Sequence, residues 1–111
     1  MFRSLIKKIL QKEGEKGRIN LVLVDDVKIR ELNRKFRKID RATDVLSFNM
    51  NEDGLLGEIA ISTATAERNA KRYGVSFPTE LKRLVVHGVL HILGYDHGEK
   101  MRNAEEIYQK L

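Results

Sequence analysis

The chain of 111 residues, 41% hydrophobic and 33% charged, has the composition of a folded globular protein, and its length predicts a single domain over residues 1–111. It contains no cysteine, which excludes disulfides and thiolate metal ligands, and no apolar run of transmembrane length, so we expect a cytoplasmic protein without a membrane partner. The formal charge of +5 lies in the first half, because residues 1–50 carry 13 Lys and Arg against 7 Asp and Glu, whereas residues 51–111 carry 8 against 9.

The first half of the chain alternates helical and strand patterns. Apolar residues at helical spacing predict a helix over residues 2–12, and the run RINLVLV, residues 18–24, predicts a buried strand. Asp25 or Asp26 is then expected to cap an amphipathic basic helix. The inward stripe of that helix is predicted to consist of Ile29, Leu32, Phe36 and Ile39.

Within this helix and its continuation, the segment Lys28–Arg41 has seven basic and two acidic residues. Such a density of positive charge can attract a polyanion by releasing its counterions. A solvated helix face has the same composition, so charge alone does not distinguish the two interpretations.

The second half of the chain begins with two strand patterns, at residues 44–50 and 55–62, which the loop NEDG joins as a hairpin. Three helices are expected to follow: one from Ser62 or Thr63 to Tyr73 with Gly74 as its end, one opening at Pro78 and ending at Gly94, and one from about Glu99 to Leu111. The order predicts an α+β fold in which helices cover a small mixed β-sheet.

The stretch HGVLHILGYDH holds the three histidines of the chain, His87, His91 and His97. On a helix, His87 and His91 share one face, and the glycine turn at Gly94 allows the chain to bring His97 back toward them. The helix is otherwise apolar nearly all round, and an unpaired buried polar group costs about 1 to 3 kcal/mol, which metal ligation would avoid. The spacing therefore predicts a site for one metal ion.

Three imidazoles without a thiolate are typical of a catalytic zinc site, since a tetrahedral ion keeps one position for water. Such an ion can lower the pKa of bound water from about 16 to about 7 or polarise a phosphoryl oxygen, so hydrolysis is the expected reaction class. Zinc is the first expectation, and nickel, copper or iron also suit three imidazoles.

The spacing of this zincin-like helix matches the zinc-peptidase pattern HExxHxxGxxH except at Gly88, where those enzymes have their catalytic glutamate. A peptidase without that general base would need a replacement from elsewhere in the chain. Glu58, Glu80 and Asp96 are the candidates.

Three segments together resemble the YbeY family of bacterial endoribonucleases: HGVLHILGYDH, LNRKFRKIDRATDVLSF at residues 32–48, and GEIAIS at residues 57–62. The resemblance implies a zinc-dependent RNase specific for single-stranded RNA. It would act in ribosomal RNA processing, at the 3′ end of the small-subunit RNA, and in ribosome quality control. The small ribosomal subunit and assembly factors such as the GTPase Era are the implied partners.

The resemblance also implies that His87, His91 and His97 are the zinc ligands and that Arg37 is the functional arginine. A guanidinium binds two phosphoryl oxygens better than an ammonium does, which supports a catalytic Arg37, although a solvated cation is the simpler interpretation. Ala42 and Asn49 depart from the family, because many members have proline at both positions.

Several alternatives stay open on the sequence alone. Asp96 can orient a ligating imidazole or stabilise the turn after Gly94, and Glu58 can face either solvent or a cleft. The competing functions are an RNA-binding ribosome assembly factor whose metal is mainly structural and a metallopeptidase with a displaced base. The nucleophile of an RNase reaction can be water or the 2′-hydroxyl of the RNA.

Overall fold

A computed structural model describes residues 2–111, which form a three-stranded sheet and five helices. The predicted α+β class is confirmed, and the strand and helix patterns lie within a few residues of where the sequence placed them. The elements are α1 (Arg3–Lys12), β1 (Arg18–Val24), α2 (Asp26–Arg37), β2 (Val45–Glu52), β3 (Leu55–Ser62), α3 (Thr63–Tyr73), α4 (Phe77–Ile92) and α5 (Glu99–Gln109).

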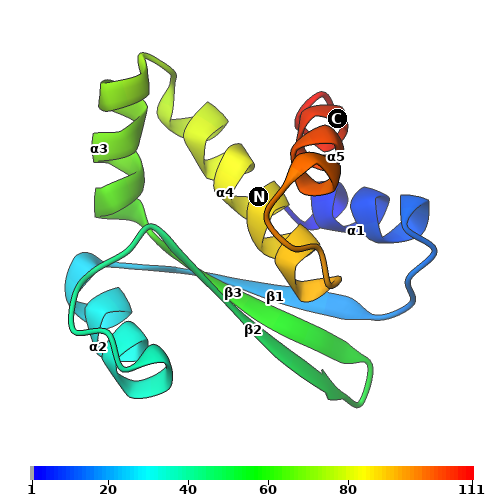
Figure 1. Cartoon of the computed structure of the whole chain (residues 1–111), viewed down its shortest axis with the longest axis horizontal. Coiled ribbons are helices and arrows are strands. Elements are labelled where there is room, and N and C mark those ends of the chain that lie inside the picture. Colours follow the sequence, from blue (N-terminus) through cyan, green and yellow to red (C-terminus); the bar gives the residue numbers. More distant parts are fainter. Residues whose placement is uncertain (1) are drawn as a thin grey trace.

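The sheet is mixed and has the strand order β1-β3-β2 (Figure 1). β1 runs parallel to β3, and β2 pairs with β3 as the predicted antiparallel hairpin. The expectation that β1 is a buried strand was wrong, because only Ile19 in it is buried, while Val22 is 38% and Leu23 46% exposed. Its place at the edge of the sheet accounts for this exposure.

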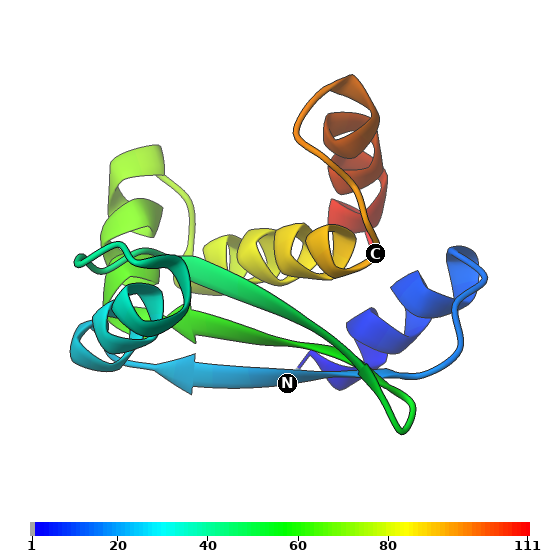
Figure 2. The same ribbon diagram turned by 60° about the horizontal axis from the view of Figure 1, so that its bottom comes forward.

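The core lies between the sheet and α4, which crosses one face of the sheet between α3 and α5 (Figures 1 and 2). Ile59 and Ile61 of β3 are fully buried beneath this helix, together with its Val85, Val89 and Leu90. α1 and α5 complete the same cluster with one apolar stripe each. The helix with the candidate metal ligands is therefore the central element of the core.

Side-chain caps and glycines end the helices much as the sequence indicated. Asp25 caps α2 by accepting a hydrogen bond from the backbone N–H of Lys28 at 2.8 Å. α4 begins one residue earlier than expected, because Ser76 caps it and Pro78 lies in its first turn. Gly94 has φ +96°, a conformation that side chains disfavour, and it turns the chain after α4.

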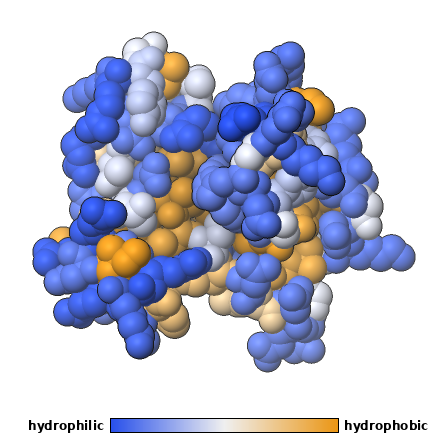
Figure 3. Space-filling model, viewed as in Figure 1, coloured by the Kyte–Doolittle hydropathy of each residue, from blue (hydrophilic) through white to orange (hydrophobic). Residues whose placement is uncertain are grey.

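The inward stripe predicted for α2 is correct only in its first part. Ile29 is fully buried, whereas Phe36 is 55% and Ile39 44% exposed. The helix ends at Arg37 and Lys38 takes a left-handed conformation, so Ile39 no longer follows the helical face. Figure 3 shows apolar surface within the otherwise hydrophilic region over α2.

Among residues 2–111, no helix is both long enough and apolar enough to cross a membrane.

Candidate metal centre

The three histidines converge at the C-terminal end of α4. The ring centroids lie 4.6 Å apart for His87 and His91, 4.9 Å for His91 and His97, and 5.7 Å for His87 and His97. One nitrogen from each ring can be chosen so that all three lie within 4.8 Å of one another, which is an arrangement that can hold a metal ion. Helical spacing places the first two rings, and the turn at Gly94 brings in the third.

His87 has a partner outside the cluster. Its Nδ1 lies 3.3 Å from Oε1 of Glu105 in α5, and both side chains are largely buried. When Nδ1 carries the proton and donates to this carboxylate, Nε2 has a free lone pair for a metal ion.

The environment of His91 favours its neutral form. Burial lowers the pKa of His91, and the neighbouring His87 and His97 lower it further. A metal ion binds only the deprotonated nitrogen of an imidazole, so a lowered pKa reduces the competition from protons. The donor set and its surroundings therefore fit a divalent transition-metal ion.

Arg37 lies in the same groove as the three imidazoles. The groove has a volume of about 520 Å³ and runs between the histidines, the end of α2 and strand β2. One guanidinium nitrogen of Arg37, Nη2, donates to the backbone oxygen of Ser47 at 2.7 Å. This bond holds the side chain against the wall of the groove and uses only part of the five N–H donors of an arginine.

Strand β2 forms the wall opposite the histidines and is joined to α4 by side chains. The side-chain amide of Asn49 donates a hydrogen bond to the backbone oxygen of Ile92 at 2.9 Å. The hydroxyl of Ser47 donates one to the backbone oxygen of Gly88 at 3.4 Å. A proline at position 49 would lack the first of these bonds, so the departure of this chain from the family pattern has a structural use here.

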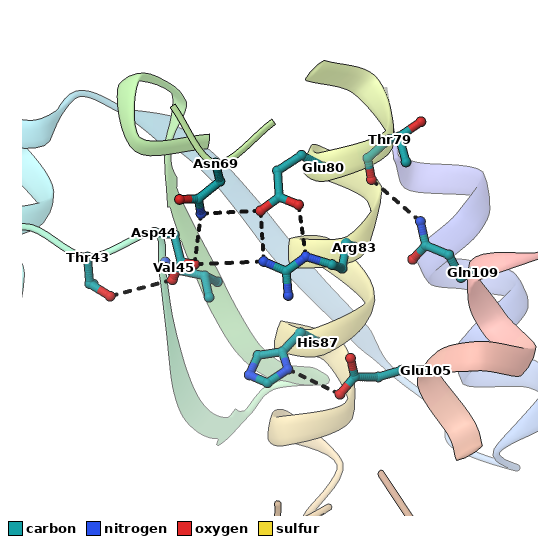
Figure 4. A network of polar contacts seen from close by, with 10 residues as sticks. All are labelled: Thr43, Asp44, Val45, Asn69, Thr79, Glu80, Arg83, His87, Glu105 and Gln109. Carbon is teal, nitrogen blue, oxygen red and sulfur yellow. Dashed lines mark hydrogen bonds and ion pairs between the residues drawn. The ribbon is translucent and has the colours of Figure 1, made fainter. Parts of the chain in front are cut away.

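A polar network that the sequence analysis did not identify lies beyond His87 along α4 (Figure 4). Glu80, which is 1% exposed, accepts two hydrogen bonds from Arg83 at 2.8 and 2.7 Å. The amide of Asn69 bridges Glu80 and Asp44, at 3.2 Å from each. The network joins α3 and the residue that precedes β2 to α4.

Of the three acidic residues considered as replacements for a peptidase base, Asp96 is exposed in the turn directly before His97, and the other two lie away from the histidines. Glu58 lines a groove between α1 and β1, and Glu80 is held by Arg83 within the network. Gly88 packs so closely against Ile59 that a Cβ at position 88 would lie 3.0 Å from two side-chain atoms of Ile59. This tight contact between α4 and β3 leaves little room for a glutamate side chain at position 88, between the two histidines of the helix.

Three imidazoles on a helix and its following turn, next to an arginine in an open groove, form the kind of site that metal-dependent hydrolases use. The family model described as "Endoribonuclease YbeY" matches residues 1–110, so the chain belongs to the YbeY family of endoribonucleases. The resemblance found in the sequence is thereby confirmed.

Individual relatives agree with this assignment. An Endoribonuclease YbeY of Desulfitobacterium hafniense is 48% identical over 87% of this chain and 73% of the relative, and one of Thermotoga maritima is 39% identical over 97% and 72%. The solution structure of TM1509 from Thermotoga maritima matches with a TM-score of 0.75 and 35% identity, covering 98% of this chain and 77% of that one.

Proposed function

We propose that the chain is a zinc-dependent endoribonuclease that cleaves single-stranded RNA during ribosomal RNA processing. Family membership supports the reaction class. The observation that carries the proposal is the convergence of His87, His91 and His97 in one groove with Arg37. Within ribosomal RNA processing, maturation of the small-subunit 3′ end and ribosome quality control are the proposed tasks.

The three histidines would hold one zinc ion. Their neutral imidazoles match the nitrogen ligands that zinc prefers, and they leave a coordination position for water or substrate. A bound zinc ion supplies Lewis-acid chemistry, either by polarising a phosphoryl oxygen or by lowering the pKa of a bound water.

Arg37 would bind the phosphate at which the RNA is cut. The negative charge on phosphoryl oxygens grows in the transition state, and a guanidinium offers two parallel N–H donors to it. The bond from Arg37 to the backbone of Ser47 reduces the freedom of the side chain before substrate arrives, which lowers the entropic cost of binding.

The basic surface of α2 would guide the RNA strand into the groove. Five cationic residues of α2 are exposed: Lys28 and Arg30 near its start, and Arg34, Lys35 and Arg37 in its last turn, from which Arg37 reaches the groove. Neutralising RNA phosphates at this surface releases counterions and makes binding dependent on salt. The proposed partners are ribosomal RNA, the small ribosomal subunit and assembly factors such as Era, in the cytoplasm.

The test compares metal removal with the loss of a ligand. Protein treated with a chelator and the variant His91→Ala should both lose cleavage of a single-stranded RNA, and added zinc should restore only the former. Arg37→Ala should lower kcat/KM by 10-fold or more, whereas Arg34→Ala on the same helix should change mainly the salt dependence of binding. Cleavage that resists chelation would contradict the proposal, and elemental analysis of the purified protein identifies the metal.

The ends of the RNA products identify the nucleophile. A 2′,3′-cyclic phosphate requires attack by the ribose hydroxyl, whereas a 5′-phosphate requires attack by water. The same variants separate cleavage from ribosome assembly, because a protein that acts only as an assembly factor would bind ribosomal subunits without cutting RNA.

A further inference from the structure

The hydrogen bond between His87 and Glu105 joins the candidate metal site to the last helix of the chain. Figure 4 shows the two side chains pointing toward each other, one from α4 and one from α5, with the imidazole Nδ1 and the carboxylate Oε1 3.3 Å apart. The exposed fraction is 21% for the His87 side chain and 27% for that of Glu105. Water therefore screens this contact only in part.

The position of Glu105 is fixed by the packing of α5. Met101, Ala104 and Tyr108 form the buried stripe of this helix, and Glu105 follows Ala104 at the border of that stripe. One turn further on, the amide of Gln109 approaches the backbone oxygen of Thr79 in α4 at 3.5 Å. These contacts hold the Glu105 backbone beside α4 without help from a metal ion.

We propose that Glu105 is a positioning residue for the metal ligand His87. Its carboxylate accepts the Nδ1 proton of His87, which selects the tautomer whose Nε2 lone pair is free and turns that nitrogen toward His91 and His97. The negative charge of Glu105 also makes Nε2 a better electron donor. The inference rests on the proposed metal function of the three histidines, and it assigns the orienting role to Glu105 in place of Asp96.

The expected size of the effect follows from similar arrangements in other metal sites, where loss of the carboxylate behind a ligating imidazole weakens metal binding by about 10- to 100-fold. A contact that only holds two helices together would change protein stability instead. Metal affinity therefore distinguishes the two roles.

The experiment measures the zinc affinity of metal-free protein by competition with a chromophoric chelator. Glu105→Ala should weaken zinc binding by about 10- to 100-fold. Glu105→Gln keeps an oxygen acceptor but no charge, so its zinc affinity should lie between those of Glu105→Ala and the wild type. Glu106→Ala is the matched control, because Glu106 is the exposed neighbour on the same helix, and its affinity should stay unchanged. An affinity of Glu105→Ala within twofold of the wild type would overturn the inference.

A second measurement reports on His87 directly and needs no metal. Long-range ¹H–¹⁵N spectra of the metal-free protein should show the Nδ1-protonated tautomer of His87 in the wild type and a mixture of tautomers in Glu105→Ala. Glu105→Leu, which also removes the acceptor but keeps more of the apolar side chain, keeps the question answerable if the alanine variant fails to fold. An unchanged tautomer in whichever of these two variants folds would count against a positioning role.

The outcome can be separated from that of the proposed function. If the wild type cleaves RNA and all variants have equal zinc affinities, only the proposed role of Glu105 is refuted. Weakened zinc binding in Glu105→Ala together with no cleavage by the zinc-loaded wild type would remove only the ribonuclease assignment.

Discussion

Gly88 lies between two metal-ligand candidates and at the closest approach of α4 to the sheet. A Cβ built at this position would lie 3.0 Å from Cδ1 and Cγ2 of Ile59 and 3.1 Å from Cγ1. Ile59 is fully buried in the core, so its side chain has little room to move away. We therefore expect Gly88→Ala to destabilise the protein even though alanine is the better helix former.

Two opposing contributions determine the size of the effect. Replacing glycine by alanine inside a helix gains about 1 kcal/mol, whereas an extra methyl group in a packed core costs about 1 to 3 kcal/mol. The expected net loss in the free energy of unfolding is about 1 kcal/mol, measured by urea denaturation of the metal-free protein. Stabilisation of Gly88→Ala by about 1 kcal/mol, as at an exposed helical position, would refute the reasoning.

A double-mutant cycle with Ile59→Ala tests the cause, because this substitution removes all three atoms that the new methyl group would meet. In the Ile59→Ala background, Gly88→Ala should become neutral or stabilising, with a coupling energy of about 1 to 3 kcal/mol. Ile59→Ala alone costs about 2 to 5 kcal/mol, so the cycle is measured in a stabilising salt such as sulfate. Additive effects of the two substitutions would show that Ile59 is not the obstacle.

Three further predictions concern the frame around the site. Gly57→Ala should destabilise by ~3 kcal/mol in urea denaturation, because its Cβ would lie 2.5 Å from a backbone oxygen of the paired strand β2; a loss below ~1 kcal/mol would show that the strands yield easily. Arg83→Ala should lower the free energy of unfolding by about 2 kcal/mol at neutral pH, which is less than for a fully buried pair because Arg83 is 41% exposed. Adding Glu80→Gln to this variant should recover part of the loss, because it removes the unpaired buried charge. Hydrogen bonds, first from Ser62, lower the pKa of Asp26 to about 2, so its contribution is complete above pH ~4 and is lost between pH ~4 and ~2. Asp26→Asn should flatten the pH dependence of the unfolding free energy in this range by about 1 kcal/mol, after discounting for solvent screening, and an unchanged acid transition would contradict this assignment.

Features that depend on local sequence were predictable, and features that depend on distant neighbours were not. The strand β3 and the hairpin with β2 follow from residue type and turn chemistry, which act within a few residues. The burial of β1 depends on which elements cover it, and its apolar residues gave no sign that Val22 and Leu23 lie at an open edge. The same limit explains the exposed Phe36, since a helical stripe shows which residues share a face but not how much of that face is covered.

The same distinction between local and distant features applies to the candidate site. The pairing of His87 with His91 follows from four-residue spacing, and the glycine turn before His97 made its return toward them reasonable to expect. Arg37 came from the resemblance to a family, because its own segment contains many similar cations. The approach of Glu105 to His87 depends on how α5 packs across α4, which no short-range pattern contains.

The structure also bears on whether the proposed metal would be structural or catalytic. The main apolar cluster joins four of the helices to the sheet through fully buried residues, among them Ile9, Ile61, Leu84 and Leu90, and the imidazoles lie at its margin. His97 is exposed and lies in the turn after α4, outside this core, so we expect the core to hold together without an ion. A structural zinc site usually replaces a core that a small domain lacks, and its four protein ligands leave no position open. Since this chain has a continuous core and offers three imidazoles next to a groove, a bound ion would be placed to act on substrate, and the metal-free protein should remain folded.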